Sequence, residues 1–264
     1  MWNIINYNLK KQSRGIGLYL ASLIGFAWMY IALFPSMQKI DIEAMMSQMP
    51  KEFTAFLGEG GAAAYSKIEG FLSGEFLSFF FVLLIGFYVS SAAGSAIAGA
   101  IDKRTMDFEL SQPVSRSGKL LAETIVALLY SAILVVATNA SIKVLCELYD
   151  ISISGMGLFY FSIVATLFAW ALFGIAILIS SIARSKMAVV GITMFIALGS
   201  YIFYSLSLAV EKIRDFGHYT LYNFYDPQKI LTKAEITLEQ CLVFATIFII
   251  GTSVALLIFN KKDV

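Results

Sequence analysis

The residues able to do nucleophilic or metal chemistry are few and widely separated in this sequence. His218 is the only histidine, and the two cysteines, Cys146 and Cys241, have no metal-ligand spacing. Metal sites and histidine-assisted nucleophiles need such side chains in a cluster. We therefore expect no metal site, no bound cofactor and no catalytic residue, and the cysteines are more typical of buried small apolar side chains. A serine–lysine arrangement remains open.

Energy-converting chemistry is also missing from the chain. No Gly-x-x-x-x-Gly-Lys-Ser/Thr segment occurs that would bind the phosphates of ATP. Charged residues lie near the ends of the apolar stretches: Glu123 near the start of one, and Lys143 and Glu147, four residues apart, near its end. Proton- or ion-coupled carriers usually place ionisable groups at mid-membrane depth, where each is costly and marks function. The pattern argues against a self-powered transporter.

The elements that hold these residues are membrane spans. Of the 264 residues, 59% are hydrophobic and 14% are charged, whereas soluble domains carry about 25% charged residues. A helix crossing the bilayer needs about 20 mostly apolar residues. Six stretches qualify and predict an all-α membrane protein of one transmembrane domain, residues 1–264, with spans at about 16–35, 76–100, 120–142, 157–182, 188–209 and 240–259.

The distribution of charge predicts the orientation. Six spans place both termini on one side, and the segments on that side carry 11 Lys or Arg and 5 Asp or Glu, against 8 and 13 on the other. Basic residues in short loops favour the cytoplasm. Both termini are therefore expected to be cytoplasmic.

The first residues predict a short amphipathic helix before the first span. Trp2, Ile5 and Leu9 share one helical face, and the basic residues Lys10, Lys11 and Arg14 follow. Such a segment favours a helix lying in the membrane interface. The alternative is a frayed basic terminus.

Two polar features inside or between spans have alternative interpretations. Asn139 lies within the third stretch, where it indicates either a hydrogen bond between helices or a residue of a transport pathway. The Tyr-rich stretch from Tyr219 to Tyr225 predicts an aromatic belt at the membrane surface.

Residues 101–119 form the longest loop on the predicted cytoplasmic side. Asp102 to Leu110 can form a helix, which Pro113 would end. Ser117 is a candidate cap for the third span. A membrane protein without its own energy source either conducts passively or uses a partner's energy, and this loop is the only inner one long enough to dock such a partner. The alternative is a solvated turn.

This loop resembles the permease subunits of type-2 ABC transporters, the six-span exporter class. Their pattern is close to Glu-x-x-x-Gly-Thr-(apolar)-Glu-(apolar)-Leu-(Leu or Ser)-x-Pro-Val-Ser-Arg. Ala100 stands at the usual Glu position and Arg104 at the usual Gly position. The tail from Phe259 to Val264 also resembles the end of the family's sixth span. The residues that fit the loop pattern in order are Thr105, Met106, Asp107, Phe108, Leu110, Pro113, Val114, Ser115 and Arg116.

The resemblance implies a function and a set of partners. A coupling helix would dock on a separate ABC ATPase subunit that binds ATP and Mg, and a second permease subunit, identical or related, would complete the pathway. The cargo would be a peptide, lipid, drug or similar amphiphile, exported across a bacterial cell membrane, with membrane lipid and no nucleic acid as further partners. The alternatives are a secondary transporter or channel, or a non-catalytic assembly factor. The implied docking residues are Asp102, Lys103, Arg104, Thr105, Met106, Asp107, Phe108, Glu109, Leu110, Pro113 and Arg116.

Overall fold

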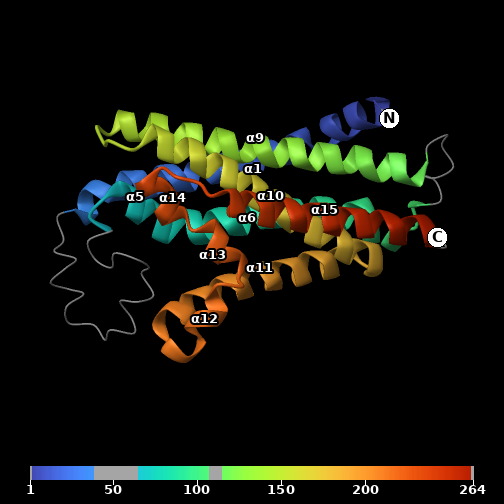
Figure 1. Cartoon of the computed structure of the whole chain (residues 1–264). Coiled ribbons are helices and arrows are strands. Elements are labelled where there is room, and N and C mark those ends of the chain that lie inside the picture. Colours follow the sequence, from blue (N-terminus) through green and yellow to red (C-terminus); the bar gives the residue numbers. More distant parts are fainter. Residues whose placement is uncertain (1, 39–64, 107–114, 263–264) are drawn as a thin grey trace.

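The computed structural model describes residues 2–38, 65–106 and 115–262. Within these ranges all regular structure is helical, and six helices are long and apolar enough to cross a membrane (Figure 1). They are α1 (Trp2–Met37), a continuous second helix made of α5 (Ile68–Phe71), η1 (Leu72–Phe80) and α6 (Phe81–Ala96), then α9 (Arg116–Leu148), α10 (Gly155–Ile182), α11 (Lys186–Ala209) and α15 (Leu238–Lys261).

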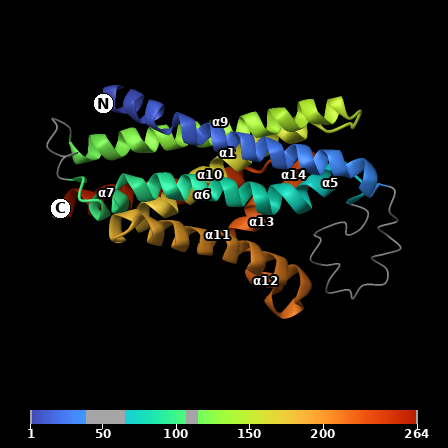
Figure 2. The ribbon, with the colours of Figure 1, turned by 180° about the vertical axis from the view of Figure 1, so that it is seen from behind.

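The predicted all-α, six-span architecture is confirmed. The beginning of α1 and the end of α15 lie at the same end of the bundle, as both views show (Figures 1 and 2). We call this the termini end. The charge pattern predicts that it faces the cytoplasm, and this orientation stays a prediction.

Hydroxyl side chains begin four of the long helices. Ser115, Ser154, Ser185 and Thr237 are the N-caps of α9, α10, α11 and α15, and each accepts a hydrogen bond from the backbone N–H three residues further on. A cap of this kind satisfies one of the N–H groups that a helix start leaves unpaired. The cap of the third span is therefore Ser115, and the prediction of Ser117 is wrong.

The second span starts earlier and is less regular than predicted. It begins at Ile68, and residues Leu72–Phe80 form a π-helix, which has hydrogen bonds five residues apart. Glu69 and Glu75 therefore lie within a spanning helix, whereas their sequence position had placed them in an outer loop. The prediction that charged residues lie near the ends of the spans holds for Glu69, the second residue of this helix, whereas Glu75 is the fourth residue of the π-helical segment.

The connection between α11 and α15 folds back onto the bundle. It contains η2 (Glu211–Ile213), α12 (Arg214–Gly217), α13 (Leu221–Tyr225) and α14 (Pro227–Lys233). Tyr222 and Tyr225 are 2% and 0% exposed, and the Tyr225 ring stacks on Phe168 of α10 at 4.4 Å between centroids. The predicted aromatic belt is wrong for these two tyrosines, which are part of the core, while Tyr219 is exposed.

The hydroxyls of these two tyrosines bond to the π-helix. Tyr222 donates to the carbonyl oxygen of Ser78 at 2.9 Å, and Tyr225 donates to that of Leu77 at 3.0 Å. A buried hydroxyl needs a partner, and carbonyls of an irregular helix have spare capacity to accept. The connection is thereby fixed to the second span.

The first span and the segment before it form one continuous helix. Ile5 is buried against Ala122 and Val126 of α9, and the hydroxyl of Tyr130 donates to the carbonyl oxygen of Leu9 at 2.7 Å. Trp2, Lys10, Lys11 and Arg14 are exposed. The segment is helical as expected, and its position in the membrane interface stays a prediction.

Candidate functional site

A break in the second span positions the loop at the termini end. Helix α6 ends at Ala96, its C-cap Ile97 has φ −127°, and the short helix α7 (Ala98–Asp102) follows. The hydroxyl of Ser180 accepts from the N–H of Ala98 at 3.1 Å, and the ammonium of Lys119 donates to the carbonyl oxygen of Ala96 at 2.9 Å. Side chains of α10 and α9 thus satisfy the backbone groups that the break releases, as a buried position requires.

The chain turns sharply after α7. Asp102 is the last residue of this helix, and Arg104 adopts φ 54°, in the left-handed region. The N–H of Thr105 then donates to the carbonyl oxygen of Ala100 at 2.9 Å. A helix running from Asp102 to Leu110 is therefore wrong for its first residues, because a left-handed residue ends a helix. Any docking helix in this loop begins after Arg104.

The left-handed residue also explains the glycine that the resemblance expects at this position. Glycine adopts a positive φ without steric cost, whereas Arg104 has a Cβ that opposes it. Arg104→Gly is expected to leave stability unchanged or raise it by up to about 1 kcal/mol. Thermal unfolding of the purified protein measures this. Arg104→Ala, which keeps the Cβ, is the control, and a lower unfolding temperature for the glycine variant than for the alanine variant would contradict the explanation.

The implied docking residues differ in their accessibility. Asp102, Lys103, Arg104 and Thr105 are exposed at the termini end, whereas Met106 is 2% exposed, with its sulfur 3.7 Å from the Lys119 ammonium. A partner at this end of the bundle therefore meets the turn and not the Met106 side chain. The remaining loop residues, Asp107, Phe108, Glu109, Leu110 and Pro113, lie outside the described residues.

Arg116 belongs to a junction between three spans. Its guanidinium donates to the carbonyl oxygen of Lys262 just after α15, and the Lys262 ammonium donates to the carbonyl oxygen of Ser181 at the end of α10. The hydroxyl of Ser117 donates to Oδ1 of Asn260 at 3.1 Å. Burial, and then the nearby charge of Arg184, lower the pKa of Lys262. These hydrogen bonds connect α9, α10 and the end of α15 at the termini end of the bundle.

Removing the Arg116 side chain is expected to weaken this junction without any partner present. Arg116→Ala should lower the free energy of unfolding by about 1–2 kcal/mol, because a hydrogen bond from a charged donor is lost and the Lys262 carbonyl is left unpaired. The measurement is thermal unfolding of the isolated protein. Arg14→Ala, which removes an exposed arginine of α1 outside the junction, is the control. Equal unfolding temperatures for the two variants would show that this hydrogen bond does not stabilise the junction.

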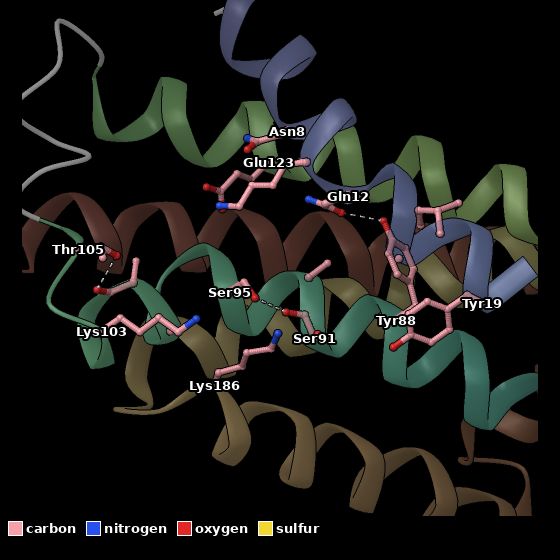
Figure 3. A pocket seen from close by; sticks show the side chains of 16 residues that line it. Asn8, Gln12, Tyr19, Tyr88, Ser91, Ser95, Lys103, Thr105, Glu123 and Lys186 are labelled. Atoms are coloured by element: carbon pink, nitrogen blue, oxygen red, sulfur yellow. Dashed lines mark hydrogen bonds between the residues drawn. The ribbon is translucent and has the colours of Figure 1, made fainter.

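A polar pocket of about 520 Å³ adjoins the turn after α7 (Figure 3). Its wall is made by α1, α6, α7, α9 and α11, and the Tyr88 hydroxyl donates to Oε1 of Gln12 at 3.4 Å across it. The residues lining it are Asn8, Lys11, Gln12, Gly15, Ile16, Tyr19, Tyr88, Ser91, Ala92, Ser95, Gly99, Ala100, Lys103, Thr105, Glu123 and Lys186.

Sequence reasoning missed most of this pocket. Lys11 and Lys103 were singled out for other roles, and Gln12, Tyr88 and Ser91 were not considered. One signal was available: polar residues recur at the termini-end turns of the first two spans, where lipid-facing helices are usually apolar. That these turns face one another, and face Lys186 of α11, depends on tertiary packing.

Asn139 bonds between two spans. It is 3% exposed, and its side-chain amide donates to the hydroxyl of Ser162 on α10 at 2.9 Å, while its Oδ1 has no partner among the described residues. This contact is the one that the helix–helix interpretation requires. A role in a transport pathway stays a prediction.

Metal-binding clusters of His, Cys, Asp and Glu do not occur in the ranges that the structure describes. Cys146 is buried on α9 with a free thiol, and Cys241 on α15 is half-buried and also free. Lys143 and Glu147 pair at 3.2 Å at the end of the bundle opposite the termini.

These features define a class, a multi-pass helical membrane protein with a polar loop junction at the termini end. The sequence matches the family model described as ABC-2 family transporter protein over residues 2–264. The chain belongs to this family, as the resemblance of its loop and tail indicated. Members are membrane components of ABC transporters, normally not catalytic themselves, and membership implies association with an ABC ATPase in general. A comparison with curated proteins finds no match.

Proposed function

We propose that this chain is the permease subunit of an ABC exporter that moves a peptide, lipid, drug or similar amphiphile across a bacterial cell membrane. The chain itself hydrolyses nothing. A separate ABC ATPase binds ATP and Mg, and a second permease subunit, identical or related, completes the pathway. Both termini face the cytoplasm.

The observation that carries the proposal is the exposed turn after α7 in a member of this family. Asp102, Lys103 and Arg104 project from the termini end with no span covering them. The turn is held by backbone hydrogen bonds to α7, and α7 is held to α10 through Ser180. An ATPase that docks here acts on the bundle through a short, ordered connection.

The route from the docking surface into the membrane follows these contacts. A displacement of α7 by the ATPase moves Ser180 on α10, and it moves α9 through Lys119, which bonds the carbonyl oxygen of Ala96. Helix α7 also packs against α11. One docking event therefore biases three spans, and ATP binding drives transport because the closed and open ATPase pairs hold α7 in different positions.

The test is reconstitution with an ABC ATPase encoded beside this chain. The ATPase is expected to co-purify on a tag placed on this chain, and amphiphile export from proteoliposomes should require ATP. A partner ATPase with its P-loop lysine replaced is the control, which should still associate but not transport. Absence of association, together with transport driven by an ion gradient alone, would identify a secondary transporter instead.

A further inference from the structure

The polar pocket between α1, α6 and α11 has an excess of positive charge. Lys11, Lys103 and Lys186 line it from three different elements. Glu123 is the one carboxylate among the lining residues, and it lies 3.7 Å from the Lys119 ammonium, so a neighbouring cation already offsets its charge. The pocket therefore favours an anion.

The cationic groups repel one another in the absence of such an anion. Lys103 and Lys186 bring like charges to the same pocket, and Lys186 is half-buried at the start of α11. Figure 3 shows both side chains extending toward Ser91 and Ser95 of α6. Bringing like charges together in a partly buried place costs free energy unless a counter-charge enters. Lys186 is half-buried, whereas Lys11 and Lys103 are exposed, so an anion would bind at a pocket that is partly open to solvent.

The neutral lining fits a phosphate. The pocket presents hydroxyl groups of Tyr19 and Ser91 and the side-chain amides of Asn8 and Gln12, all of which can donate hydrogen bonds, while the Tyr88 hydroxyl already donates to Gln12. Phosphate oxygens accept several such bonds, and charged donors strengthen them. A volume of about 520 Å³ lies within the range of small-ligand sites, about 300–1,000 Å³. Basic pockets between membrane spans are a known place for anionic lipid headgroups.

We infer that this pocket binds a phosphate group carried by an anionic phospholipid headgroup or by a soluble phosphate, with Lys103 and Lys186 as its principal cationic ligands. The inference does not depend on transport or on an ATPase. It concerns the isolated chain, and it can hold or fail independently of the proposed function.

The test is native mass spectrometry of the purified full-length protein in detergent. Phosphatidylglycerol, phosphatidylcholine and inorganic phosphate are titrated separately into the wild type and into the variant Lys103→Gln/Lys186→Gln. The variant is expected to bind the anionic ligand about thirtyfold more weakly, because each lysine near an anionic lipid contributes about a factor of five. The matched control is Lys10→Gln/Lys261→Gln, which removes two exposed lysines at the same end outside the pocket.

A second variant tests the pocket without removing charge. Ser91→Leu fills part of the cavity and should weaken the same ligand at least tenfold. If phosphatidylglycerol binds more tightly than phosphatidylcholine and both variants weaken its binding, the site is assigned to a lipid headgroup. If inorganic phosphate alone binds, the site is assigned to a soluble phosphate. Equal loss in the Lys10/Lys261 control, or no loss in the Lys103/Lys186 variant, overturns the inference.

Discussion

Replacing Gly251 by leucine is expected to separate α15 from α10 and to destabilise the protein by about 3 kcal/mol. These two helices form the most extensive helix pair of the described structure. A Cβ at Gly251 would meet the carbonyl group of Gly174, and one at Gly174 would lie 2.7 Å from the Phe248 Cα. The obstructing atoms belong to the backbone and cannot rotate away. Small residues allow such close approach of helices in membranes.

Thermal unfolding in detergent measures this effect, followed by the fluorescence of Trp170 in a background in which Trp2 and Trp28 are replaced by phenylalanine. Trp170 lies on α10 with its ring 6.2 Å from that of Phe248 on α15, so its emission reports on this helix pair. Gly191→Leu is the control, since no heavy atom lies within 4 Å of a Cβ built there. It should change stability by less than about 1 kcal/mol. An unchanged unfolding temperature for Gly251→Leu would show that the helices do not meet at these glycines.

Exchanging the charges of the exposed turn is expected to weaken binding of the partner ATPase strongly. The double variant Asp102→Lys/Arg104→Glu keeps the net charge of the chain. Each reversed side chain, however, faces a like charge on an ATPase surface that complements the wild-type turn. We expect affinity for the ATPase to fall at least about thirtyfold, or about 2 kcal/mol, and ATP-driven transport to fall with it. Co-purification and ATPase activity of the reconstituted complex measure both.

The matched control is the opposite exchange at the far end of the bundle. Lys143→Glu/Glu147→Lys also keeps the net charge, and it reverses a pair that lies 3.2 Å apart on α9. This variant should bind the ATPase like the wild type. Both exchanges should leave the unfolding temperature nearly unchanged, because surface ion pairs contribute little to stability. Normal association of the Asp102/Arg104 variant would place the docking surface elsewhere.

The number and identity of the spans follow from the sequence because hydrophobic length is a local property. Each stretch of about 20 apolar residues has to be a helix in lipid, whatever it packs against. The burial of Tyr222 and Tyr225 is a tertiary property. Tyrosine suits both a membrane surface and a core with hydroxyl acceptors, and only the carbonyls of Leu77 and Ser78 decide between them.

Less of the candidate site than of the fold could be predicted from the sequence. The loop pattern located the polar segment after the second span, but it predicted a helix from Asp102 where the structure has a turn with Arg104 at a positive φ. The extent of a helix there was not predictable, since the break at Ile97 depends on Ser180 and Lys119 from other spans. The pocket has the same origin, because its lysines are distant in sequence and meet only when α1, α7 and α11 pack.

The π-helical segment puts the two halves of the second span out of phase. Residues joined by hydrogen bonds five apart advance around the axis by a smaller angle than the 100° per residue of an α-helix. A cysteine or tryptophan scan interpreted at constant α-helical pitch would therefore assign residues before Phe81 to the wrong face. Glu75 lies in this segment. The direction in which its carboxylate points is accordingly set by the local winding of the helix.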